Sequence, residues 1–126
     1  MKKIINTSLA PAPIGPYSQA VLVNNTLYVS GQVAFEPSTG KLITINIIKE
    51  TNQVMHNLMN ILKEADMDFS NVVKVSIFLI DMNNFGTVNE VYGSYFKENF
   101  PARETIQVSR LPKDVNVEIS LIAVKS

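Results

Sequence analysis

Hydrophobic residues change their spacing along the chain, and these changes predict where strands and helices lie. Short apolar or alternating runs, which are typical of strands, occur at residues 4–5, 20–23, 27–33, 72–80, 105–109 and 115–123. In two other segments, 46–66 and 85–96, apolar residues recur every three or four positions, as in amphipathic helices. The predicted order is therefore three strands, a helix, a strand, a second helix and two final strands.

Turn residues separate these segments. Asn24-Asn25 predicts a tight hairpin turn, because asparagine tolerates the positive φ angles that such turns need. Residues 8–16 contain three prolines and one glycine, which predict a stiff loop. Gly31 interrupts the third strand, and this indicates a bulge or the close approach of another group to the backbone.

The order of elements predicts a two-layer α+β fold. The strand–helix–strand connection between residues 27 and 80 needs a crossover, and right-handed crossovers place the helix on one face of the sheet. We expect the second helix on the same face, which leaves the other face uncovered. That face would expose apolar residues, namely Phe78, Ile80, Ile122 and Val124 or their neighbours. An exposed apolar patch usually marks an interface, so we predict a homo-oligomer that packs through it.

The last two strands carry the strongest chemical pattern. Residues 105–109 and 115–123 alternate on either side of a turn at residues 111–114, so we predict an antiparallel hairpin. Such a hairpin would bring Arg103 near Glu118. A guanidinium beside a carboxylate is either a reactive pair or a structural cross-strand ion pair, and the hairpin alone does not decide between the two.

Composition narrows the function. The chain has 126 residues, 46% of them hydrophobic, which predicts one domain over residues 1–126. Basic and acidic residues number 11 each, so charge gives no reason to expect nucleic acid or an anionic membrane as a partner. The lack of cysteine excludes thiolate catalysis, and His56, the only histidine, has no second histidine for a metal site. No signal segment or membrane span is found, so we predict a cytoplasmic protein.

Five segments, in order along essentially the whole chain, resemble the RidA (YjgF) family. They are Ile14-Gly15-Pro16-Tyr17-Ser18-Gln19-Ala20, Val29-Ser30-Gly31-Gln32, Thr87-Val88-Asn89, Pro101-Ala102-Arg103 and Leu111-Pro112-Lys113-Asp114-Val115-Asn116-Val117-Glu118-Ile119. The resemblance implies a chorismate-mutase-like fold and a homotrimer with active sites between subunits. It implies no cofactor and no metal. It also implies hydrolysis of reactive 2-imino acids, such as 2-iminopropanoate and 2-iminobutanoate, to 2-keto acids and ammonia. In that family the imines arise from enamines released by pyridoxal-phosphate-dependent dehydratases.

Matched position by position, the family's site residues fall on Arg103, Glu118, Tyr17, Ser30, Gly31, Asn89 and Thr105. The resemblance implies that Arg103 binds the substrate carboxylate, since an arginine fork holds a planar carboxylate with two hydrogen bonds. It implies that Glu118 positions and activates water. Three positions depart from the family: Thr105 stands where cysteine is common, Glu104 where serine or threonine is common, and Ser120 where glutamate is common. We expect strand alternation to turn the Glu104 side chain away from Arg103.

Two other functions stay open from the sequence. One is a non-catalytic trimer that binds small carboxylic acids in the same clefts and has a regulatory or protective role. The other, a nuclease or translation inhibitor, is disfavoured by the zero net charge and the lack of a basic aromatic patch. Taken singly, Tyr17, Ser30, Gly31 and Asn89 would be packing, bulge or surface residues, and their functional interpretation depends on the resemblance.

Overall fold

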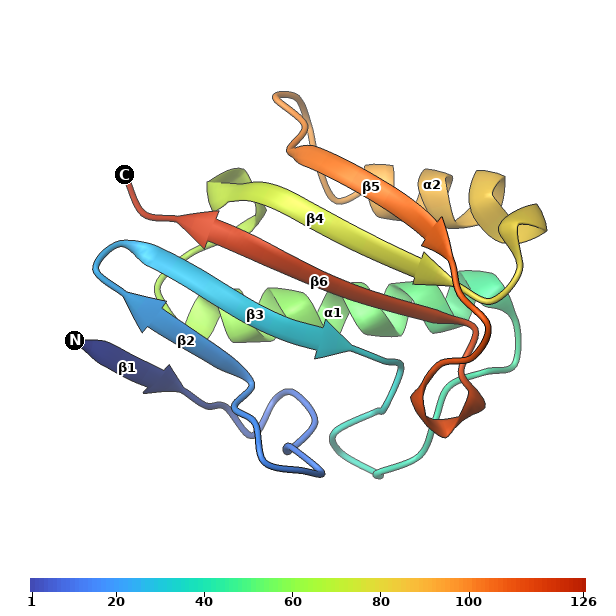
Figure 1. Ribbon diagram of the computed structural model, residues 1–126, viewed down its shortest axis with the longest axis horizontal. Helices are drawn as coiled ribbons and strands as arrows, with labels where there is room; N and C mark the ends of the chain where they lie inside the picture. Colours follow the sequence, from blue (N-terminus) through green and yellow to red (C-terminus); the bar gives the residue numbers. More distant parts are fainter.

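The computed structural model describes all 126 residues and places six strands in one sheet beside two helices (Figure 1). The strands are β1 (Lys2–Ile5), β2 (Ala20–Val23), β3 (Thr26–Gln32), β4 (Val72–Leu79), β5 (Ala102–Gln107) and β6 (Val117–Val124). The helices are α1 (Ile47–Glu64) and α2 (Phe85–Gly93), and short 3₁₀ turns span Phe69–Asn71, Met82–Asn84 and Pro112–Asp114. The predicted order of strands and helices is confirmed.

The sheet is mixed. Its strand order is β1-β2-β3-β6-β4-β5, and every neighbouring pair is antiparallel except β4 and β5, which run parallel. The predicted hairpin of β2 and β3 is confirmed, with Val23 opposite Thr26. Its turn uses the positive φ expected of asparagine, 54° at Asn24.

The predicted hairpin of the last two strands is wrong. β5 and β6 do not pair, because β4 lies between them and pairs with both. The β4–α2–β5 connection is a crossover, which sets β5 parallel to β4 at the edge of the sheet. The segment from Gln107 to Val117 then carries the chain back past β4 to its other side, a width of roughly 10 Å for two strand spacings.

Alternate residues of the central strands face the helices and form the core. Both helices lie behind the sheet in Figure 1, on its one covered face. The buried residues that β4 and β6 turn toward the helices are Val75, Ile77, Leu79, Val117, Ile119, Leu121 and Ala123. α1 meets them with its buried stripe, which includes Val54, Leu58, Ile61 and Leu62. The two-layer α+β arrangement is therefore confirmed, while the chorismate-mutase-like assembly stays a prediction.

Both helices begin close to the predicted positions. The Asn46 side chain caps α1 by accepting a hydrogen bond of 2.9 Å from the Lys49 N–H, so the helix starts at Ile47. It ends at Glu64, two residues before the predicted end, and α2 ends at Gly93 rather than near Phe96. Neither helix has the length and apolar character that crossing a membrane requires.

The second sheet face carries no helix, as predicted. Tyr28 and Val124 on this face are 50% and 37% exposed, and Phe78 and Ile122 are half-buried. Ser76 and Ser120 lie opposite each other in the middle of the same face. Apolar residues thus surround a small polar strip on an uncovered surface, which suits an interface between protein copies.

Candidate functional site

One chain brings the seven predicted site residues together in two separate groups. The first lies at the junction of β3 and β6 and consists of Glu118, Gly31, Ser30 and Tyr17. The second lies between β5 and α2 and consists of Arg103, Asn89 and Thr105. We call them the Glu118 half-site and the Arg103 half-site.

Glu118 sits against the backbone of β3 at a bulge. The pairing of β3 with β6 shifts register between Val29 and Gln32, and Gly31 lies in this irregular stretch, as the sequence predicted. A methyl group added to Gly31 would lie 2.5 Å from Oε2 of Glu118. Only glycine therefore leaves enough room for the carboxylate at this position.

The Glu118 carboxyl faces a small, largely apolar cavity. The cavity has a volume of about 70 Å³, and Lys113 is the only other charged residue that lines it. Burial raises the pKa of the Glu118 carboxyl above its ordinary value. A space of this size holds about two water molecules. The half-site therefore places a carboxyl group of raised pKa beside room for water.

The loop of residues 8–16 forms one wall of this cavity, and buried Gln19 fixes the loop. The Gln19 side chain donates to the carbonyls of Thr7, Ala10 and Pro11 at 3.0, 3.3 and 2.9 Å, and its Oε1 accepts from the Thr7 N–H at 2.8 Å. Tyr17 leaves the loop as a residue that is 48% exposed, and its hydroxyl accepts from the Ile14 N–H at 3.3 Å. Gln19 thus adds four hydrogen bonds to the restriction that the prolines place on this loop.

Ser30 has a structural hydrogen bond in this half-site. Its hydroxyl donates to the Ser18 carbonyl at 2.6 Å, and its N–H donates to the Gln19 carbonyl at 2.9 Å. Both bonds hold the entry of β2 against the bulge of β3. Ser30 therefore shapes the wall beneath Tyr17, while its hydroxyl proton is already committed to the backbone.

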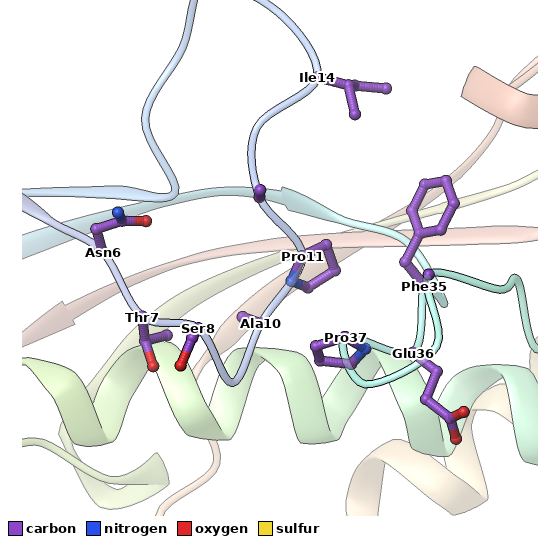
Figure 2. Close-up of a pocket in the computed structure, with 11 residues that line it drawn as sticks. Asn6, Thr7, Ser8, Ala10, Pro11, Ile14, Phe35, Glu36 and Pro37 are labelled. Carbon is purple, nitrogen blue, oxygen red and sulfur yellow. The ribbon is translucent and has the colours of Figure 1, made fainter.

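A larger groove adjoins the Glu118 cavity. It has a volume of about 540 Å³ and runs between the loop of residues 6–14 and the turn of residues 35–40. Figure 2 shows Ile14 and Phe35 on opposite sides of the groove, with Pro11 and Pro37 below them. Pro11, Ile14 and Phe35 also line the Glu118 cavity. Because Glu36 is the only charged residue lining the groove, we place the chemistry in the smaller cavity.

The Arg103 half-site is built on one face of α2. Positions 85, 89 and 92 lie on the same side of a helix, and all three side chains contact the guanidinium. Asn89 Oδ1 accepts a hydrogen bond of 2.6 Å from Nη1 of Arg103. The guanidinium carbon lies 5.1 Å from the Tyr92 ring centroid and 5.6 Å from that of Phe85, within cation–π range. Nε and Nη2 remain free for a carboxylate.

Two buried hydroxyls near Arg103 have no hydrogen-bond partner. They are the Tyr92 hydroxyl and Oγ1 of Thr105. Burial raises the pKa of the Tyr92 phenol, and the charge of Arg103 opposes that rise. Buried polar groups are normally satisfied, so unpaired hydroxyls beside a free arginine fork indicate a surface that is completed by another molecule.

The two half-sites face opposite sides of the sheet. Arg103 is opposite Val75, which points to the helices, whereas Glu118 is opposite Phe78 and lies on the uncovered side. From the strand spacing, their Cα atoms are roughly 14 Å apart. The prediction that Arg103 lies near Glu118 in one chain is therefore wrong, and the structural ion pair is not formed.

The expected orientation of Glu104 is confirmed. Its carboxylate accepts a hydrogen bond from Ser76 and pairs with Lys74 at 3.0 Å on the uncovered sheet face. The Ser76 hydrogen bond, followed by the interaction with Lys74, lowers the pKa of Glu104. Its negative charge is thus turned away from Arg103 and already has a partner. His56 is exposed on α1 with its ring edge-on to Tyr95, as a surface residue.

Sequence reasoning missed three residues that shape the site. Gln19 holds the loop, Tyr92 packs on the guanidinium, and buried Glu50 accepts hydrogen bonds from the start of β6. Gln19 belongs to the first of the five family-like segments, but a pattern of residue types does not reveal the hydrogen bonds that its buried side chain makes. Tyr92 follows Asn89 by three positions, and helical spacing could have linked the two.

Replacing Gly31 by alanine is expected to reduce kcat for the imino-acid hydrolysis that the resemblance implies by about tenfold or more. Small displacements of reacting groups lower reaction rates by large factors. The new methyl group would lie 2.5 Å from Oε2 of Glu118 and push the carboxylate out of place. Gly86→Ala is the matched control, because a methyl group there meets no atom within 4 Å. Equal kcat values for Gly31→Ala and the wild type would contradict the close contact.

Glu118→Gln is expected to raise the thermal midpoint at neutral pH. Because the carboxyl has a higher pKa in the folded than in the unfolded chain, its ionised form destabilises the fold, and glutamine removes that penalty. The gain is full above the folded pKa and disappears as the pH falls toward the unfolded value of about 4.3. Thermal unfolding of both proteins from pH 4 to pH 8 measures it. A difference in thermal midpoint that grows toward acid pH would contradict a raised pKa of Glu118 in the folded protein.

Comparisons with known proteins give a consistent result. The family model described as Endoribonuclease L-PSP matches residues 7–125. A mouse protein named 2-iminobutanoate/2-iminopropanoate deaminase is 52% identical over 125 residues, covering 99% of this chain and 93% of the mouse protein. The structure of the Rid-family protein YyfA from Yersinia pestis has a TM-score of 0.97 and 45% identity, covering 99% of this chain and 100% of that one. E. coli TdcF, solved with bound serine, has a TM-score of 0.95 and 38% identity, covering 98% and 99%.

Proposed function

Since this chain belongs to the endoribonuclease L-PSP family and its Rid proteins, we propose that it is a deaminase that hydrolyses 2-imino acids to 2-keto acids and ammonia. The substrates are 2-iminopropanoate and 2-iminobutanoate, by similarity to the mouse relative of that name. The observation that carries the proposal is the pair of half-sites. One offers a free arginine fork, and the other offers a carboxyl of raised pKa beside space for water.

Arg103 binds the substrate carboxylate. Its Nε and Nη2 groups donate two parallel hydrogen bonds, and Asn89 with the Tyr92 and Phe85 rings fixes the plane of the guanidinium. Each charge-assisted bond contributes about 1.5–3 kcal/mol net. The fork also orients C2, the electrophilic carbon next to the carboxylate, so that one of its faces meets the water.

Glu118 handles the water and its protons. The water oxygen bonds to C2 of the protonated imine while Glu118 takes a proton from the water. Glu118 then returns the proton to nitrogen. As a carboxylate again, it takes the proton of the new hydroxyl while the C–N bond breaks and the C=O bond forms, so that ammonia leaves and this last proton passes to solvent. A raised pKa brings the carboxyl closer to working pH, which suits a group that must both accept and donate a proton.

The complete site forms between two copies of the chain, with Arg103 from one subunit and Glu118 from its neighbour. The two half-sites are different surfaces, so the contact that joins them is head-to-tail, and a contact of this kind makes a ring when the rotation between subunits closes. We propose that the ring is a trimer, as the resemblance to the RidA family implies. The uncovered sheet face, with Tyr28 and Val124 exposed, supplies apolar area for this contact.

The proposed activity is tested by generating 2-iminopropanoate in place with an amino-acid oxidase. Semicarbazide traps the imine, and the protein competes with the trap. We expect the wild type to abolish most semicarbazone formation, and Arg103→Ala to lose about 10²–10⁴-fold in kcat/KM because two charge-assisted bonds are gone. No acceleration by the wild type, or full acceleration by Arg103→Ala, would refute the proposal.

The family description also names an endoribonuclease. The chain has a net charge of zero, which gives no overall electrostatic attraction to RNA, and its single histidine lies on the exposed side of α1, outside both half-sites. RNA cleavage that co-purifies with the oligomer and is lost in Arg103→Ala would support that activity instead.

A further inference from the structure

Glu50 is a fully buried acidic residue that the proposed chemistry does not use. It lies in the first turn of α1 with no exposed surface, and it has no basic partner. All hydrogen bonds of its side chain go to one place, the start of β6. Oε2 accepts from the backbone N–H groups of Asn116 and Val117 at 2.8 and 3.3 Å, and Oε1 accepts from the Asn116 side chain at 2.8 Å.

These backbone groups need an acceptor because β3 ends too early to supply one. The last β3–β6 pair is Gln32 with Ile119, so Asn116 and Val117 lie beyond the reach of that ladder. A buried N–H without a partner is costly, and the Glu50 carboxylate takes over the role that a neighbouring strand would have. α1 thereby holds the entry of β6 across the core.

The turn that precedes this point is strained. Lys113 and Asp114 both have positive φ, 60° and 55°, although neither is glycine. Such conformations persist only where the surroundings hold them. On the protein surface, Arg110 donates hydrogen bonds of 2.6 and 3.2 Å to the Asp114 carboxylate. On the core side, the Asn116 N–H donates to Glu50. A strained turn fixed at both ends defines where the following strand begins.

We propose that Glu50 is the positioning residue that holds Glu118 in its reactive place. Glu118 follows the anchored Asn116-Val117 pair directly, and its carboxylate must fit against Gly31 with no spare room. If the entry of β6 loosens, the carboxylate leaves that contact and turns toward solvent. This inference depends on the proposed function for its kinetic consequence, but the displacement of Glu118 is a claim about structure alone.

The kinetic test compares Glu50→Ala with Leu62→Ala at a temperature where both are folded. Leu62 is fully buried at the far end of α1, so its loss destabilises the same helix and leaves the hydrogen bonds of Glu50 to Asn116 and Val117 in place. We expect Glu50→Ala to lower kcat by about 10–100-fold with KM changed less than about threefold, because Arg103 still binds the carboxylate. Leu62→Ala should keep both values. Equal effects of the two variants would show a merely structural role and overturn the inference.

A second readout does not require activity. Glutamate labelled with ¹³C at the side-chain carboxyl allows the Glu118 titration to be followed by NMR, with Glu118→Gln to assign the signal. In Glu50→Ala the Glu118 pKa should fall toward its ordinary value as the group becomes solvated, whereas Leu62→Ala should leave it raised. An unchanged Glu118 pKa in Glu50→Ala would overturn the inference, even if the wild type proved to be no deaminase.

Glu50→Gln should rescue most of the function. Its amide oxygen still accepts from the Asn116 N–H, and its NH₂ can donate to the Asn116 side chain once that amide turns over. We expect kcat within about fivefold of the wild type, since the same oxygen also accepts from the Val117 N–H and only the negative charge of the carboxylate is lost. A Glu50→Gln variant as impaired as Glu50→Ala would show that hydrogen-bonded anchoring is not the cause.

Discussion

Glu118→Gln is expected to lower kcat for imine hydrolysis by about 10²–10⁴-fold, the usual contribution of a general base or acid. Glutamine keeps the size of the side chain, so the contact with Gly31 and the shape of the cavity persist. It cannot accept the proton from water or return one to nitrogen. The loss should therefore appear in kcat, while carboxylate binding by Arg103 is retained.

The same variant separates a deaminase from a non-catalytic carboxylate binder. Affinity for 2-oxobutanoate, measured by calorimetry, should stay within about twofold, because the proposal assigns the two charge-assisted bonds to Arg103. Glu64→Gln makes the same chemical change on the exposed end of α1 and should leave both quantities unchanged. If Glu118→Gln kept the wild-type affinity and neither it nor the wild type turned over the imine, the result would instead support a non-catalytic carboxylate-binding protein.

Much of the fold is predictable because local chemistry determines it. The Asn24-Asn25 turn connects β2 to β3 as its sequence predicts, and Asn46 caps α1 one residue from the predicted start. Strand alternation correctly turns Glu104 away from Arg103. The motif resemblance to the RidA family is confirmed by the family match and by the Rid-family structure.

The arrangement of the last two strands is not a local property. Residues 105–109 and 115–123 alternate around a turn, but alternation does not say which strand becomes the neighbour. β4 is buried on its helix-facing side and pairs along both of its edges, so it occupies the place between them. For this reason the residue types of the site were deduced from motifs, while their distribution over two faces of the sheet needed the topology.

Mixed oligomers of Arg103→Ala and Glu118→Gln subunits are expected to regain about one third of the wild-type activity, although each variant alone is nearly inactive. In one chain the two residues lie on opposite sheet faces, roughly 14 Å apart, so neither half-site is complete by itself. Under the proposed shared site, a working site forms where an intact Arg103 of one subunit meets an intact Glu118 of the next. In a cyclic trimer with both kinds of subunit, one junction of this type always exists.

The experiment uses two affinity tags, so that only mixed oligomers are purified, and light scattering to establish the number of subunits. The control mixes wild-type chains with chains that carry both substitutions. Sites shared between subunits predict about one sixth of full activity for equal amounts of the two mixed species, whereas sites within one chain predict about one half. Sites within one chain also predict no recovery when the single variants are mixed. Mixed trimers as inactive as their parents would thus contradict the shared site, and the contrast between the two mixtures excludes a loss caused by poor assembly.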